Sequence, residues 1–232
     1  MHHPEYHTSP IGPKLNKLRA AVLGANDGIV SIAGLVFGVA GATAESSVIV
    51  ATGIAGIAAG VISMAVGEYV SVSSSRDSEH ALLAKEKFEL QAYPEQEFKE
   101  LQSIYEKKGL SKETAQKVAE ELTQHNAFLA HAEAELKIDP EHLTNPLQAA
   151  FASSGAFFLG ALIPLIAIAL PSPDIRVPIA VGAVLLALSV TGFVSASIGG
   201  GGKTKAVLRV VLGGILAMAI TYGIGTLVGS AL

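Results

Sequence analysis

Five long apolar segments set the strongest constraint on how this chain can fold. The hydrocarbon core of a bilayer is about 30 Å thick, so a helix needs about 20 mostly apolar residues to cross it. Half of the residues are hydrophobic and 16% are charged, whereas soluble domains carry about 25% charged residues. We therefore predict an all-α polytopic membrane protein with five transmembrane helices. The segments are residues 20–44, 47–71, 146–170, 177–198 and 206–232.

A charged insert separates the second apolar segment from the third and holds most of the 20 acidic residues. We expect three helices in it, because Pro94 disfavours helix at the residue before it and Ser111 is a suitable N-cap. They would run from the second span to about residue 91, over 95–107, and over 111–136. The chain then divides into a flexible cytoplasmic N-terminus (1–17), transmembrane helices one and two (18–75), the Glu-rich insert (76–145) and transmembrane helices three to five (146–232).

Lys and Arg near the span ends predict the orientation, because cytoplasmic loops carry an excess of both. In a five-span topology all but one of these residues fall on the same side, and Arg176 alone falls on the other. The N-terminus and the insert should therefore be cytoplasmic. We expect a prokaryotic inner membrane, or a vacuolar membrane in a eukaryote. The residues on the shared side are Lys14, Lys17, Arg19, Arg76, Lys203, Lys205 and Arg209.

Two acidic residues, Asp27 and Glu68, lie inside apolar segments. Charged groups in a bilayer cost several kcal/mol, so such residues are functional candidates. Each lies eight residues from a basic boundary residue, or about 12 Å along a helix. The two spans are antiparallel, so both carboxylates reach a similar depth, where they suit a divalent cation or a proton. Met64, one turn from Glu68, is either ordinary packing or a thioether ligand, which would favour a transition metal.

Glutamates recur in pairs three residues apart in the insert, and each pair shares a helix face. The break at Pro94 could fold the second insert helix back so that the pairs face each other. They would then form an all-oxygen site for divalent cations, which the third helix could close with a histidine and a further glutamate. The alternative is a solvated acidic surface. The residues concerned are Glu86, Glu89, Glu97, Glu100, His131 and Glu135.

Several motifs carry a family resemblance. They are "NDGIVS" in the first span, "GVISMAVGEY" in the second, the Glu-rich insert, and "GGGGKTKAVLRVVLGG" leading into the fifth span. With them the sequence resembles the vacuolar iron transporter (VIT) family, in a prokaryotic-type form, over nearly the whole chain after residue 17. The resemblance implies a five-span homodimer with a pore at its two-fold interface. It also implies proton-driven export of Fe²⁺ and related divalent ions from the cytosol.

The resemblance also assigns residues. Asp27 and Met64 match the pore Asp and Met of the family, and the four paired glutamates match its cytoplasmic metal-binding glutamates. Gly56 stands where eukaryotic members carry a pore Glu, a role that Glu68 could take. His131 and Ala132 align with a Met pair of the third insert helix, with Glu135 as the nearby acid.

We therefore expect a proton-coupled exporter of Fe²⁺, with Mn²⁺, Co²⁺ and Zn²⁺ as further substrates. Its partners would be metal ions, protons, the lipid bilayer and a second copy of the chain. We expect no enzyme activity, no permanently bound cofactor and no nucleic-acid partner. The alternatives are a membrane-anchored metal-binding or ferroxidase-like protein and a sensor or channel without coupling. The ferritin-type Glu-x-x-His motif is absent, which counts against the ferroxidase.

Overall fold

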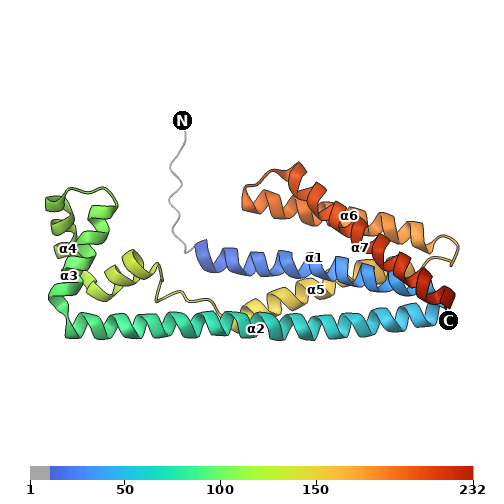
Figure 1. Cartoon of the computed structure of the whole chain (residues 1–232), viewed down its shortest axis with the longest axis horizontal. Helices are drawn as coiled ribbons and strands as arrows, with labels where there is room; N and C mark the ends of the chain where they lie inside the picture. The colour runs from blue at the N-terminus through green and yellow to red at the C-terminus, as the bar shows by residue number, and fades with distance from the viewer. Residues whose placement is uncertain (1–10, 232) are drawn as a thin grey trace. The chain divides into compact units, whose positions relative to one another are not determined.

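The computed structural model describes residues 11–231, with side chains from residue 18 onward, and residues 1–10 of the expected N-terminal segment lie outside this range. The described residues form helices and no strands (Figure 1). The helices are α1 (Ile11–Ala42), α2 (Ser46–Ala92), α3 (Pro94–Lys107), α4 (Lys112–His131), the π-helix η1 (Ala132–Leu136), α5 (Pro146–Ala169), α6 (Arg176–Gly199) and α7 (Lys203–Ala231).

Within residues 11–231, five helices are long and apolar enough to cross a membrane, which confirms the predicted all-α polytopic membrane fold. The candidate spans are Leu18–Ala42, Ser46–Ala92, Pro146–Ala169, Arg176–Gly199 and Lys203–Ala231. The second span continues without a break into the charged segment, because no Gly or Pro interrupts the chain between residues 68 and 92. The described chain forms two compact units, one of residues 71–145 and one of residues 14–70 with the chain from Pro146 onward.

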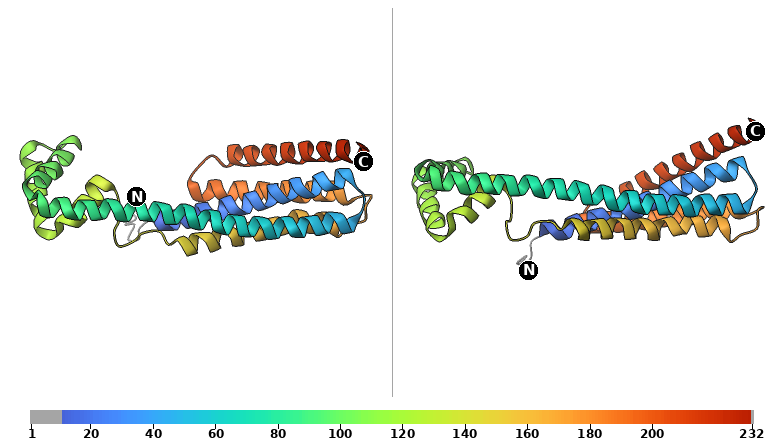
Figure 2. Two further views of the ribbon diagram at one scale, coloured as in Figure 1. Left: turned by 60° about the horizontal axis from the view of Figure 1, so that its bottom comes forward. Right: turned by 90° about the horizontal axis from the view of Figure 1, so that it is seen from below.

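The apolar unit is a bundle of α1, α5, α6, α7 and the first part of α2 (Figure 2). Glycines allow α1 to approach its neighbours closely. A Cβ at Gly28 would overlap the Phe157 carbonyl of α5, and one at Gly225 of α7 would overlap the Gly38 carbonyl. Close backbone approach through small residues is typical of helix packing in membranes. The buried core lies between these helices and includes Ile29, Val36, Phe37, Ile49, Phe157, Ile168, Val184 and Leu188.

Arg176, at the start of α6, is buried in this unit. Its guanidinium donates hydrogen bonds to the Ala44 carbonyl at 2.7 Å and to Ser46 Oγ at 3.1 Å. The last carbonyls of a helix have no partner within the helix, and a buried arginine needs acceptors. This contact therefore joins the start of α6 to the α1–α2 turn.

The insert unit contains the charged part of α2 with α3, α4 and η1. Helix α3 packs on α4 around Leu101 and Ala119. The predicted boundaries are confirmed at both helix starts. Pro94 occupies the first turn of α3, and Ser111 Oγ accepts the backbone N–H of Thr114 at 3.2 Å as the N-cap of α4.

The third insert helix is not the continuous helix that the sequence predicted. Asn126 has non-helical angles (φ −165°, ψ 93°), and its Oδ1 accepts the Leu129 N–H at 3.0 Å. Asparagine competes with helical hydrogen bonding in this way and caps a new helix start. The chain then forms the π-helix η1 and ends at Lys137, in the left-handed conformation (φ 57°). The segment 127–136 is thus a separate short helical arm.

Candidate metal centre

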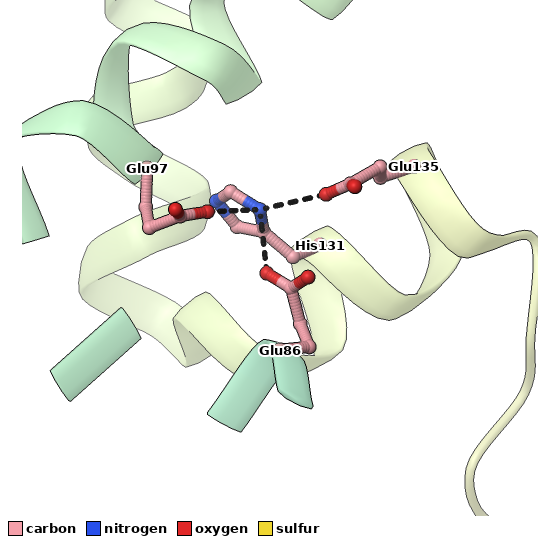
Figure 3. A group of neighbouring side chains, drawn as sticks. All are labelled: Glu86, Glu97, His131 and Glu135. Carbon is pink, nitrogen blue, oxygen red and sulfur yellow. Dashed lines mark ion pairs between the residues drawn. The ribbon is translucent and has the colours of Figure 1, made fainter. Parts of the chain in front are cut away.

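Four ligand-type side chains converge in the insert unit (Figure 3). His131 Nδ1 lies 3.0 Å from Glu86 Oε1, 3.7 Å from Glu97 Oε2 and 3.6 Å from Glu135 Oε2. One ligand atom from each of the four residues lies within 4.8 Å of the others. We call Glu86, Glu97, His131 and Glu135 the insert cluster.

The insert cluster is buried at its centre. The side chains of His131 and Glu86 are 1% and 3% exposed, and that of Glu135 is 31% exposed. Although they lie 3.0 Å apart, His131 Nδ1 and Glu86 Oε1 make no hydrogen bond to any described residue. Buried polar atoms without partners are costly. A cation placed among these atoms would satisfy both of them, so the residues present fit a metal ion.

Burial and the nearby carboxylates raise the pKa values of Glu86 and Glu97. Burial, followed by the charges of Glu135 and Glu97, raises the pKa of Glu86 to about 7. Burial and the charge of Glu100 also raise the pKa of Glu97, an effect that His131 partly opposes. A raised pKa means that a carboxyl group favours its protonated form. A bound cation would reverse this preference, because it stabilises the ionised carboxylates. A metal ion binding at the cluster would therefore compete with protons near neutral pH.

Each helix of the insert contributes to the cluster. Glu86 comes from α2, Glu97 from α3, His131 from the end of α4 and Glu135 from η1. The Asn126 break sets the direction of the arm that carries His131, and the wider turn of η1 places Glu135 on the same side as His131. Single π-helical turns occur frequently at functional sites.

The donor set has three carboxylates and one imidazole. Carboxylate and imidazole ligands together suit Fe²⁺, Mn²⁺, Co²⁺ and Zn²⁺, and the absence of a thiolate disfavours soft ions such as Cu⁺. Two of the predicted glutamates, Glu89 and Glu100, are not in the cluster. Glu89 forms an ion pair with Lys85 at 3.2 Å. The charges of Glu89 and Glu100 nevertheless contribute to the raised pKa of Glu86.

The apolar unit contains a second polar site between α1, α2 and α5. A pocket of about 480 Å³ is lined by all three predicted membrane residues, Asp27, Met64 and Glu68. Asp27 Oδ1 accepts a hydrogen bond from Ser31 Oγ at 2.6 Å, which fixes the orientation of this carboxylate. We call this space the membrane pocket. It places two carboxylates, a thioether and the hydroxyls of Ser31 and Ser63 around one volume.

Gly56 and Gly60 also line the membrane pocket. A Cβ at Gly56 would overlap the Leu35 side chain, and one at Gly60 would overlap the Phe157 ring. Leu35 therefore fills the space next to position 56. Ser31 and Ser63 were not among the predicted site residues, although Ser31 lies one helical turn after Asp27 on the same face.

Comparison with known proteins adds a family assignment. The family model described as "VIT family" matches residues 18–226. The "Vacuolar iron transporter" of Acanthamoeba castellanii is 41% identical over 96% of this chain and 82% of its own length. "Vacuolar iron transporter homolog 3" of Arabidopsis thaliana is 38% identical over 92% of this chain and 84% of its own. "VIT-like transporter 1b" of Glycine max is 33% identical over 92% of this chain and 77% of its own length. With matches of this extent, the chain belongs to the VIT family.

Proposed function

We propose that this protein transports divalent transition metals across a membrane, with Fe²⁺ as the principal substrate and Mn²⁺ as a second one. One observation carries the proposal. Asp27, Met64 and Glu68 line a single open pocket in a bundle of helices that can span a bilayer. Ionisable residues in such helices mark ion pathways. The names of the related vacuolar iron transporters support iron as the metal.

The two sites would act in sequence. The insert cluster would collect metal at the mouth of the protein, with Glu89 and Glu100 attracting cations to it. Asp27, Met64 and Glu68 would then bind the ion within the membrane. The thioether of Met64 would favour a transition metal over Mg²⁺ or Ca²⁺, which bind oxygen ligands. Nothing in this scheme requires an enzymatic step.

We further propose that export is coupled to an inward flow of protons. A carboxylate binds either a proton or a metal ion, so the two exchange at one site. Asp27 and Glu68 are the residues for this exchange. The basic residues near the span ends support a cytoplasmic insert, so metal would be collected on the cytosolic side and leave the cytosol. The membrane would be a prokaryotic inner membrane or a vacuolar membrane, and the working form a homodimer.

The decisive experiment measures metal uptake into proteoliposomes containing the purified protein. Fe²⁺, Mn²⁺, Co²⁺ and Zn²⁺ would be compared, with and without an imposed pH gradient. We expect flux of Fe²⁺ that rises when protons can flow in the opposite direction. Flux that ignores the pH gradient would instead indicate an uncoupled channel.

A membrane-anchored metal-binding protein is the second candidate, since the insert cluster alone would suffice for it. Metal binding without any flux would support this candidate over transport. Oxidation of Fe²⁺ with consumption of O₂ would identify its ferroxidase-like form. The described residues around the insert cluster supply four ligands, fewer than the six of a ferritin-type di-iron centre with its two Glu-x-x-His motifs.

A further inference from the structure

A second cavity in the apolar unit takes no part in the proposed transport. It has a volume of about 520 Å³ and lies between α1, α6 and α7. It shares no lining residue with the membrane pocket, although α1 contributes to both. Asp27 lines the membrane pocket, and Asn26 lines the other cavity. We call this space the α1–α6–α7 cavity.

One end of the cavity is positively charged. Arg19 lines the cavity and is exposed, and Gly199, at the end of α6, lines it too. Lys203, Lys205 and Arg209 follow at the start of α7, close to this end. The acidic residues of the described apolar unit are elsewhere. Asp27 and Glu68 line the membrane pocket, and Glu45 and Asp174 lie in the turns at the opposite helix ends.

The interior of the cavity is mainly apolar. From Arg19 it follows α1 for two turns, about 10 Å, past Val22 and Leu23 to Asn26. Ile198 of α6 and Val210 of α7 are apolar lining residues from the other two helices, and α6 also contributes the hydroxyls of Thr191 and Ser195. At the inner end Asn26 Oδ1 is buried and has no hydrogen-bond partner among the described residues. This polar atom limits how deeply an apolar chain can enter.

We propose that the α1–α6–α7 cavity binds an anionic phospholipid, with its phosphate against Arg19 and part of an acyl chain between Val22 and Val210. Basic pockets between transmembrane helices bind anionic lipid head groups. The cavity combines such a charge with an apolar slot opening at the same helix ends. A zwitterionic lipid with the same chains would gain the apolar contacts, but its own positive charge would oppose the interaction with Arg19.

The test is native mass spectrometry of the full-length protein in detergent, with added phosphatidylglycerol or phosphatidylcholine of identical acyl chains. We expect retention of phosphatidylglycerol over phosphatidylcholine in the wild type. Arg19→Gln should lower phosphatidylglycerol binding about fivefold. Gly199→Leu should lower it by filling the cavity, since a Cβ at Gly199 meets nothing within 4 Å. Lys205→Gln is the matched control, because it removes a charge from the same end of the bundle without lining the cavity.

The outcomes separate the proposal from general attraction to anionic lipid. Loss in Arg19→Gln and Gly199→Leu with retention in Lys205→Gln supports the cavity. An equal loss in all three variants, or no preference in the wild type, overturns it. Gel filtration and thermal unfolding without lipid show which variants fold. Because the readout is lipid binding, the result stands independently of whether the protein transports metal.

Discussion

At the scale of single residues, Asp27 is the carboxylate to which the proposed function gives the most specific role. Ser31 donates a hydrogen bond to it within the membrane pocket. Asp27→Asn keeps the shape and the acceptor oxygen but removes the charge that binds a cation. We expect metal flux in proteoliposomes to fall by at least about tenfold, the lower end of the loss seen when even supporting residues of metal sites are changed.

Glu45→Gln provides the control for this prediction. Glu45 is also an acidic residue of the apolar unit, but it lies in the α1–α2 turn and accepts a hydrogen bond from Ser47. Its neutralisation should leave flux near the wild-type rate. Wild-type flux in Asp27→Asn would contradict the role given to the membrane pocket.

Glu86 gives a prediction about pH. Its raised pKa, about 7, means that below this pH the metal-free cluster holds a proton that a metal ion must displace, whereas above it Glu86 is already ionised. Affinity for Mn²⁺ should therefore fall as the pH drops from 8 to 6, by up to about tenfold per pH unit. Isothermal titration calorimetry of the purified protein would measure this slope.

Glu86→Gln should weaken binding and reduce the pH slope, because the titrating group is gone. The matched control is Glu113→Gln, since Glu113 is exposed and pairs with Lys117 on the surface of α4. An unchanged slope in Glu86→Gln would show that another group controls the pH dependence.

The sequence indicates candidate site residues more directly than it predicts which side chains surround them. Asp27 and Glu68 were recognisable because a charge inside an apolar span is costly. That Leu35 fills the space beside Gly56 depends on the rotation of α1 against α2, which no local pattern specifies. The separation of Glu89 and Glu100 from the insert cluster likewise depends on how three helices pack.

At the scale of elements, the short arm after Asn126 is the feature that builds the insert cluster. Asn126→Ala removes the cap on Leu129 N–H and favours a continuous helix through position 126. His131 would then rotate away from Glu86. We expect Mn²⁺ affinity to fall by at least about tenfold, together with a loss of about 1 kcal/mol in unfolding free energy.

Ser111→Ala is a matched control for the arm. It removes the N-cap at the other end of α4, which accepts the Thr114 N–H, and should cost a similar unfolding free energy. It should leave Mn²⁺ affinity unchanged, because it does not redirect the arm. Equal losses of affinity in both variants would mean that the break at Asn126 has no specific role.

The element boundaries were largely predictable, and the arm was not. Proline at the start of α3 and serine before α4 act through local backbone chemistry, so the sequence signals them directly. An asparagine within a helical pattern is usually tolerated on the surface. Whether it breaks the helix depends on tertiary contacts, here the burial of His131 and Ala130.

At the scale of the whole molecule, the two proposed metal sites should affect transport differently. A double variant, Glu86→Gln with His131→Ala, should raise the metal concentration needed for half-maximal flux while leaving the flux at saturating metal close to the wild-type value. Asp27→Asn should lower flux at every concentration. Concentration series in proteoliposomes distinguish the two effects, and a lowered maximum in the double variant would contradict a role limited to collection.

Arg176 constrains how the helices of the apolar unit can rearrange. Its hydrogen bonds join the first residue of α6 to Ala44 and Ser46. Any motion that keeps these hydrogen bonds must leave the start of α6 close to the α1–α2 turn. Displacement of α1 against α6 would then grow with distance from Arg176, and it would be greatest near Arg19 and Gly199, at the other ends of these two helices. A molecule bound at that end of the cavity would therefore have the largest effect on the position of α1, the helix that carries Asp27.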